Sequence, residues 1–448
     1  MIIRSKLQQL IMRSDFIKSI SVLFSGNLIA NAISFVSIPI ISRIYTQYSF
    51  GEYAVMTSLA AIVVTIASFG MTSAIMAPRD DKESKEILTI VSLLELIVIS
   101  IICIGIIIVS SKVRILNVSL NEFYSSFLFF IYSNLLGVFY LLSVFTNKRK
   151  LNRVLFTNAL INALAMFVLA IPLGLLGMKS DGLMIAAIIS YGVADLQMIW
   201  HTRPFIKVKS DIKIKKILKK YKDFVLYQYP SNLAGTFAQQ YPNQFFSQHY
   251  GNDSLGGYAM CERILGVPMR LIGSPINTVY FRQASIYIKE GKDLSHFTFK
   301  LINILLAVSF VPILILFVYS EPLFTFILGS GWSEVGKIVS ILIIPYFISF
   351  CCNCITYCLV VINKQHINLI LTLIQLVLVG GCLFVGFTYV NSFIHMLNLY
   401  AWALIIYHIL HMLAIFFYLK RHFLKFCAII SIYLLVIYIL KFLLIGTI

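Results

Sequence analysis

Two arginines and an asparagine recur at intervals of seven residues in an apolar part of the chain: Arg263, Arg270 and Asn277. A helix turns by about 100° per residue, so this interval returns to the same helical face. Arginine stays charged and binds phosphate oxygens through a two-pronged fork. The pattern therefore predicts a site for an anionic group, and Gly266 leaves room there for a ligand or for another helix. The alternative is that Arg263 pairs with Glu262 or with another acid and only stabilises the packing.

Four amide side chains form a stripe on the preceding apolar stretch. They are Gln228, Asn232, Gln239 and Asn243, at intervals of four, seven and four residues. These intervals keep the side chains on one helical face. The stripe predicts the polar lining of a cavity, and the alternative is that the amides hydrogen-bond neighbouring helices. Together with the arginines, it favours a wide, water-filled, cationic cavity.

Other ionisable residues also lie inside apolar stretches, where they are costly and mark functional sites or buried pairs. Glu95 and Asp195 are candidates for ion coupling, because either could carry a proton or pair with an arginine from the other half of the chain. Arg43 follows an apolar stretch, where it contacts substrate or anchors the helix at the headgroups. His408 and His411 lie one turn apart, and we interpret them as a packed or hydrogen-bonded pair rather than a proton relay or metal site.

The eight cysteines all fall in apolar segments, so we interpret them as small buried residues and not as a disulfide framework. The run Cys351-Cys352-Asn353-Cys354 with Cys358 has no histidine or acid beside it, and we expect no metal there. No phosphate-binding glycine loop, nucleophile elbow or zinc-binding helix motif occurs. We therefore expect no cofactor, no ATPase and no catalytic centre in the chain.

The composition indicates that the structural elements carrying these side chains lie in a lipid bilayer. Of the 448 residues, 59% are hydrophobic and only 12% are charged, more apolar surface than one soluble core can cover. Continuous apolar runs of about 20 residues fit helices that cross a hydrocarbon layer of about 30 Å. The alternation typical of barrel strands is absent. The sequence therefore predicts an all-α polytopic membrane protein.

A window of about 19 residues predicts thirteen spans. They are 19–42, 54–77, 87–110, 122–146, 154–176, 182–200, 224–248, 257–281, 301–320, 338–361, 368–389, 396–419 and 426–447. Of the 36 lysines and arginines, 28 fall on the side of the N-terminus and five on the other. This bias predicts a cytoplasmic N-terminus. We attribute the net charge of +18 to the basic loops that set this orientation in the membrane, and we expect no nucleic-acid partner.

The loop 201–222 holds nine basic residues and is predicted to be a cytoplasmic linker lying on anionic headgroups. It separates an N-terminal lobe, 1–200, with spans one to six from a C-terminal lobe, 223–419, with spans seven to twelve. Residues 420–448 are expected to add an accessory C-terminal span.

An internal repeat supports this division. Residues 27–54 align without gaps to 232–259, with seven identities that include Gly51 with Gly256. Six spans separate the copies, so both have the same orientation. The sequence therefore predicts two six-helix bundles related by a parallel repeat, around a path that opens to each side in turn.

Several short motifs resemble the polysaccharide-export, or O-antigen (Wzx-type), flippases of the multidrug/oligosaccharidyl-lipid/polysaccharide (MOP) exporter superfamily. They are Gly26-Asn27-Leu28, Pro39-Ile40-Ile41-Ser42-Arg43-Ile44-Tyr45, Phe50-Gly51-Glu52-Tyr53-Ala54, Ser68-Phe69-Gly70-Met71 and, in the second half, Gly256-Gly257-Tyr258-Ala259 with Arg263 and Pro268. The resemblance implies two six-helix bundles around a cationic cavity in the bacterial inner membrane. Members commonly have twelve or fourteen spans, so the predicted thirteen departs from the family.

The resemblance further implies a function in lipopolysaccharide or other surface-polysaccharide biosynthesis. Such proteins move undecaprenyl-pyrophosphate-linked oligosaccharides to the periplasmic leaflet by alternating access, coupled to a proton or sodium gradient. The implied partners are the lipid-linked oligosaccharide, membrane lipids, and the polymerase and chain-length machinery. In this interpretation Arg263 and Arg270 hold the pyrophosphate, and the amides and nearby tyrosines contact sugar hydroxyls.

Three alternatives stay open. A multidrug exporter of the same superfamily would need acids for cationic drugs, whereas the predicted cavity is cationic. A lipid II flippase is the second. From another class, a membrane polysaccharide polymerase or ligase would need a large outer loop, and the longest one predicted here is the short segment 321–337.

Overall fold

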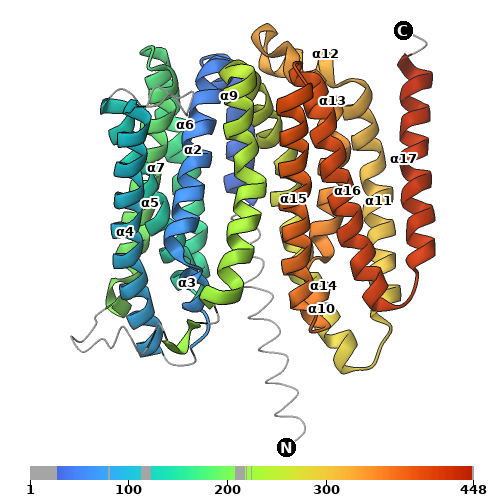
Figure 1. The fold of residues 1–448 in the computed structure, drawn as a ribbon, viewed down its shortest axis with the longest axis horizontal. Helices are drawn as coiled ribbons and strands as arrows, with labels where there is room; N and C mark the ends of the chain where they lie inside the picture. The colour runs from blue at the N-terminus through green and yellow to red at the C-terminus, as the bar shows by residue number, and fades with distance from the viewer. Residues whose placement is uncertain are drawn as a thin grey trace, which may run out of the picture. The chain divides into compact units, whose positions relative to one another are not determined.

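A computed structural model of the protein describes residues 28–78, 81–112, 123–206, 217, 219–222 and 224–445. All regular elements in these ranges are helical (Figure 1). The chain forms two compact units. The N-terminal unit consists of Met1–Tyr45 and Val55–Thr236, and the C-terminal unit of Thr46–Ala54 and Phe237–Ile448.

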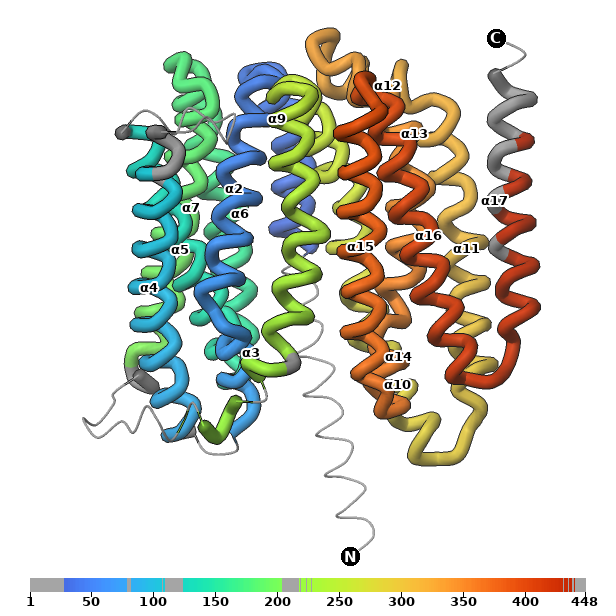
Figure 2. The backbone as a smooth tube through the Cα atoms, in the orientation of Figure 1, coloured from blue at the N-terminus to red at the C-terminus, as the bar shows by residue number. Residues whose placement is uncertain are grey.

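The N-terminal unit is an assembly of long helices in which α7 packs against α5 and α6, and α4 packs against α5 (Figure 2). Its elements are the helix Leu28–Ile41, most of α2 (Gln47–Ser68), α3 (Met71–Ala74), α4 (Asp81–Lys112), α5 (Phe123–Lys148), α6 (Asn152–Leu175), α7 (Lys179–Ile206), the π-helical turn η1 (Phe224–Gln228) and the start of α9 (Tyr229–Pro268).

In the C-terminal unit, α13 packs against α11, α12 and α16, and α15 packs against α16. Besides most of α9, the unit contains the π-helical turn η2 (Met269–Gly273), α10 (Ser274–Lys289), α11 (Leu294–Val318), α12 (Ser320–Leu328), the short 3-10 turn η3 (Ser330–Trp332), α13 (Ser333–Ile355), α14 (Cys358–Val361), α15 (Gln365–Tyr389), α16 (Phe393–Leu419) and α17 (Phe423–Ile445).

Within the described ranges, nine helices are long and apolar enough to cross a membrane. They are Gln47–Ser68, Lys82–Ile106, Tyr124–Lys148, Asn152–Leu175, Lys179–Arg203, Leu294–Val318, Ser330–Val361, Gln365–Tyr389 and Phe393–Leu419. Each overlaps one predicted span, which confirms the polytopic all-α fold. The second predicted span, 54–77, is placed too late, because α2 ends at a left-handed turn at Phe69 (φ 45°) and Gly70 (φ 70°).

The other four predicted spans have mixed outcomes. Span 19–42 begins outside the described residues and continues as the helix Leu28–Ile41, and span 426–447 falls mostly on α17. Spans 224–248 and 257–281 fall mainly on α9, η2 and α10, which are less apolar because they carry the amides and arginines. A backbone break at Gly251 (φ 84°, ψ 166°) separates the two helical parts of α9.

Some predictions lie outside the described residues. These are the first 27 residues, with the Gly26-Asn27 motif, and most of the predicted linker, including Lys213, Lys215 and Lys216. The predicted lobe boundaries and the internal repeat stay predictions.

Candidate functional site

The two candidate arginines contact each other through the main chain. Arg263 lies near the end of α9, and Arg270 lies in η2, where its Nη2 donates a hydrogen bond to the Arg263 carbonyl at 3.0 Å. The Arg270 guanidinium lies over Gly266, since a Cβ at that glycine would be 2.6 Å from Nη1. The space beside Gly266 is thus filled by Arg270 itself, and the expectation that it is left for a ligand or another helix is wrong.

Glu262 does not neutralise Arg263. Its Oε1 accepts hydrogen bonds from the hydroxyls of Tyr258 at 2.8 Å and Tyr346 at 2.7 Å. In the described part of the chain, Glu262 and Arg263 form no ion pair. The positive charge of Arg263 also acts on Arg270, and the two cations repel each other. An anionic group bound near both would relieve this repulsion.

A polar cavity of about 270 Å³ lies beside Glu262 within the C-terminal unit. Its walls come from α9, α13, α15 and α16, and most lining side chains carry hydrogen-bonding groups. They include Gln239, Gln240, Glu262, Tyr346, Ser349, Asn353, Gln375, Tyr400, Tyr407 and His408. Pockets for drug-sized ligands measure about 300–1,000 Å³. This cavity therefore suits water, an ion or one polar group rather than a whole oligosaccharide.

The hydrogen-bond network around Glu262 extends to α16. The Tyr258 hydroxyl lies 3.5 Å from that of Tyr400. His408 lines the same cavity, and its Nδ1 has no hydrogen-bond partner among the described groups. Glu262 and His408 were not predicted as site residues, and the tyrosines expected near the amides were not identified individually. Glu262 was detectable, because it is an acid in an apolar stretch, as Glu95 is, but the sequence analysis treated it only as a partner of Arg263.

The predicted amides belong to different units. Gln228 Nε2 donates to Asn232 Oδ1 at 2.9 Å, and both residues lie in the N-terminal unit. Gln239 lines the polar cavity, and Asn243 is buried in the C-terminal unit. The Oδ1 atoms of Asn243 and, on α10, Asn277 are buried without a described hydrogen-bond partner. Such atoms are uncommon in folded proteins and are satisfied by water or by a ligand.

Two buried acids lie in the N-terminal unit. Glu95 on α4 is 2% exposed, accepts a hydrogen bond from the Thr72 hydroxyl at 2.9 Å through Oε1, and faces Gly137 of α5 with Oε2. Asp195 on α7 is 3% exposed. Glu95 Oε2 and both Asp195 oxygens have no hydrogen-bond partner, and neither acid has an ion pair, in the described part of the unit. Whether either acid pairs with an arginine of the other lobe stays a prediction.

The remaining candidates are less constrained. Arg43 is exposed in the turn between the helix Leu28–Ile41 and α2. The Tyr407 hydroxyl lies 3.4 Å from His411 Nδ1. Cys351, Cys352, Cys354 and Cys358 are buried free thiols. Among the residues that can be described, no three histidines, cysteines or acids are grouped to hold a metal ion.

The fold is that of MOP-superfamily transporters. A lipid II flippase, MurJ, in an inward closed conformation aligns with 94% of this chain and 97% of its own at a TM-score of 0.65 and 14% identity. An inward-facing multidrug resistance MATE transporter aligns with 90% of this chain and 98% of its own, at a TM-score of 0.63 and 15% identity. A MOP transporter from Pyrococcus furiosus is described as having a binding pocket of reverse polarity. It aligns with 90% of this chain and 96% of its own, at a TM-score of 0.54 and 16% identity.

These neighbours are transporters and flippases, not enzymes. The chain belongs to the polysaccharide biosynthesis protein family, whose sequence profile matches residues 40–337. A comparison with curated protein sequences finds no match. The chain is therefore a multi-pass membrane protein of that family with a MOP-superfamily fold.

Proposed function

We propose that the chain is a flippase for a lipid-linked oligosaccharide. The substrate is an undecaprenyl-pyrophosphate-linked repeat unit of O-antigen or another surface polysaccharide, which crosses the bacterial inner membrane by alternating access. The family membership and the fold shared with a lipid II flippase support a function in polysaccharide export. The adjacent cations Arg263 and Arg270 carry the proposal, because they match an anionic pyrophosphate.

In this mechanism the arginines bind the pyrophosphate, Gln239 and Asn243 contact sugar hydroxyls, and the lipid tail stays in the bilayer. Gln228, Asn232, Asn277 and Arg43 are secondary candidates for sugar or headgroup contacts. The bias of basic residues supports a cytoplasmic N-terminus and uptake of the substrate from the cytoplasmic side. The flipped unit is then available to the polymerase and chain-length machinery, which are the proposed protein partners.

We propose that an ion gradient drives the cycle. An ionised carboxylate buried without a cation is disfavoured by several kcal/mol. Glu95, Asp195 and Glu262 are therefore candidates to take up a proton or a sodium ion on one side of the membrane and release it on the other. Glu262 is distinct because it borders a polar cavity of a size that suits an ion and its water.

A deletion strain complemented by Arg263→Ala with Arg270→Ala tests the proposal. We expect complete single repeat units to accumulate in the cytoplasmic leaflet and surface polysaccharide to be lost. Arg153→Ala is the matched control, because Arg153 is an exposed arginine on α6. Surface polysaccharide at the wild-type level in the double variant, at equal expression, would contradict the assigned roles.

The same strains separate the alternatives. Single units that reach the periplasmic leaflet but stay unpolymerised in the deletion strain would indicate a polymerase or ligase. Increased drug sensitivity with intact polysaccharide would indicate a multidrug exporter. Loss of viability on depletion would indicate a lipid II flippase, the activity of the MurJ structure that shares this fold.

A further inference from the structure

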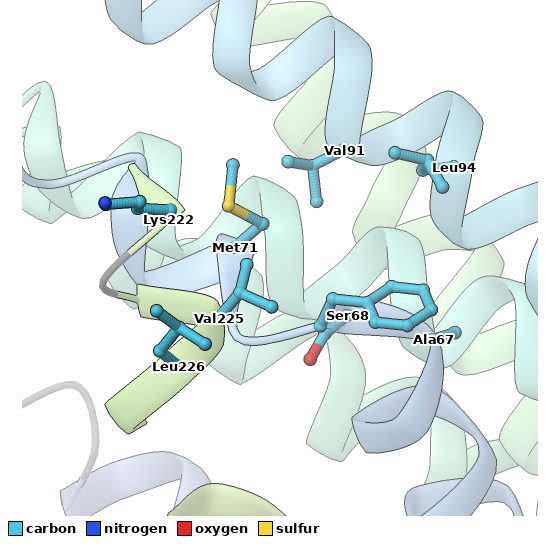
Figure 3. A pocket seen from close by; sticks show the side chains of 9 residues that line it. Ala67, Ser68, Met71, Val91, Leu94, Lys222, Val225 and Leu226 are labelled. Atoms are coloured by element: carbon cyan, nitrogen blue, oxygen red, sulfur yellow. The ribbon is translucent and has the colours of Figure 1, made fainter. Parts of the chain in front are cut away.

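A second cavity, of about 420 Å³, lies inside the N-terminal unit (Figure 3). Seven apolar side chains from α2, α3, α4, η1 and the turn after α2 line it, and Ser68 and Lys222 are its two polar residues. In Figure 3 the Lys222 nitrogen lies at the opposite end of the group from Leu94 and Ala67. The cavity is thus an apolar chamber with one cation at its rim.

Among the described residues, none balances the single charge at the rim. The Ser68 hydroxyl donates to the Thr65 carbonyl at 2.9 Å and accepts from the Gly70 amide at 3.2 Å, so its hydrogen bonds are satisfied locally. Lys222 is exposed, and no hydrogen bond or ion pair joins it to any described residue. Its ammonium group is therefore available to an anion.

Nearby lysines are engaged. Lys220 pairs with Glu83, whose hydrogen bond raises the pKa of the lysine. Lys148 donates to the carbonyls of Ile75 and Pro78 at 2.9 and 2.6 Å. Lys222 therefore differs from these two lysines, because no described residue pairs with its charge.

The walls of the cavity are held in place. At the left-handed Gly70, a Cβ would lie 2.9 Å from the Phe224 carbonyl, so the turn after α2 packs directly on η1. The Tyr229 ring lies 5.6 Å from that of Phe69, and the Tyr229 hydroxyl donates to the Ile66 carbonyl at 3.2 Å. Tyr221 is buried in the core of α3, α4 and α5 and fixes the segment that carries Lys222. The chamber is thus preformed.

We propose that this cavity binds an acyl chain of an anionic membrane phospholipid, with the lipid phosphate on Lys222. Hydrocarbon in an apolar chamber of this size would make dispersion contacts with its apolar walls. Basic pockets between transmembrane helices bind anionic headgroups, and Lys222, the one lysine that lines this cavity, supplies the matching charge. The volume accommodates part of one hydrocarbon chain, and the single ammonium group at the rim matches the single phosphate of a bilayer phospholipid. The pyrophosphate of the proposed substrate is assigned instead to Arg263 and Arg270. This lipid site does not depend on the proposed flippase activity.

The test measures which lipids the purified full-length protein retains. The protein is reconstituted in vesicles of equal phosphatidylcholine and phosphatidylglycerol, extracted in mild detergent, and its bound lipids are identified by native mass spectrometry. We expect wild type to retain phosphatidylglycerol preferentially. Lys222→Gln should lower that preference about fivefold, the scale of one basic residue at an anionic surface. This variant changes an exposed side chain, so folding is not at issue.

Two further variants make the test specific. Lys219→Gln removes the same charge from an exposed lysine that does not line the cavity, and it should keep the preference. Leu94→Trp fills the chamber and should reduce retention of both lipids while the melting temperature is maintained. An unchanged preference in Lys222→Gln would overturn the site, as would equal losses in both lysine variants. Competition by free glycerol phosphate as effective as that by phospholipid would show headgroup binding without an acyl chain, which also overturns it.

Discussion

Gly51 at the start of α2 lies directly against the main chain of Asn252 in the second part of α9. A Cβ at Gly51 would be 1.9 Å from the Asn252 carbonyl oxygen. The reciprocal contact occurs as well, because a Cβ at Gly256 would be 1.9 Å from the Gln47 carbonyl oxygen. In the alignment of the two repeat copies, which are 205 residues apart, Gly51 corresponds to Gly256 and Gln47 to Asn252. The two contacts are therefore equivalent. This exchange supports the proposed repeat, since two equivalent segments that cross would contact each other in this way.

Gly51→Ala and Gly256→Ala should each lower the melting temperature. The clash is with main-chain atoms, which cannot move aside as a flexible side chain can, and overpacking of this kind costs about 1–3 kcal/mol. Gly380→Ala on α15 is the control, because nothing lies within 4 Å of its Cβ. That variant should gain about 0.5–1 kcal/mol from helix propensity. Thermal unfolding of the purified protein in detergent measures all three, and an unchanged melting temperature in the first two would contradict the contact.

Gly266→Ala should impair transport without destabilising the helix. The new methyl group would lie 2.6 Å from Arg270 Nη1 and would displace the guanidinium from its place over Gly266 and from the Arg263 carbonyl. Alanine is otherwise a better helix former than glycine by about 1 kcal/mol. We expect surface polysaccharide to fall while the melting temperature holds or rises. Normal polysaccharide in this variant would mean that the position of Arg270 is not required.

Glu262→Gln should separate ion coupling from folding. Glutamine is close to glutamate in size and can still accept from Tyr258 and Tyr346, so the network is retained without the charge. We expect an unchanged melting temperature and loss of the dependence of transport on the ion gradient, measured in proteoliposomes with a fluorescent lipid-linked oligosaccharide. Glu290→Gln at the end of α10 is the exposed control. Full gradient dependence in Glu262→Gln would assign coupling to Glu95 or Asp195.

Asp293 should make the start of α11 sensitive to acid. It caps the helix by accepting the His296 amide at 3.1 Å, and it pairs with Arg421. The His296 amide, followed by Arg421, lowers the pKa of this carboxyl. Because the folded-state pKa lies below the unfolded value of about 3.9, the stabilisation is present above about pH 4 and is lost as pH falls through the folded-state pKa.

Asp293→Ala should therefore lower the melting temperature at neutral pH, by an amount equivalent to about 1 kcal/mol for a lost cap. As the pH falls through the folded-state pKa the gap between the two proteins should narrow, because protonation removes the ionic part of the contribution in wild type. Asp293→Asn, which can still cap, should lie between them at neutral pH. An equal gap between wild type and Asp293→Ala at neutral pH and below the folded-state pKa would contradict the linkage.

The sequence predicted the nine confirmed spans because hydropathy over a helix length is a local property. It also singled out Arg263 and Arg270 as a pair, since their spacing is local, and their shared helical face stays a prediction. It missed what depends on distant residues: Tyr346 on α13 and Tyr400 on α16 reach the Glu262 network from more than 80 residues away. The π-helical turn η2, which brings Arg270 over Gly266, leaves no periodic signal that hydropathy can detect.

Helix α2 belongs to the C-terminal unit through Ala54 and to the N-terminal unit from Val55 onwards, and α9 changes unit between Thr236 and Phe237. Each half of the chain therefore contributes a segment to the unit formed mainly by the other half. A cut within the predicted linker would leave both fragments incomplete on their own. Fragments 1–206 and 217–448, produced together, are accordingly expected to assemble into one split protein, because each supplies a piece of the other's core.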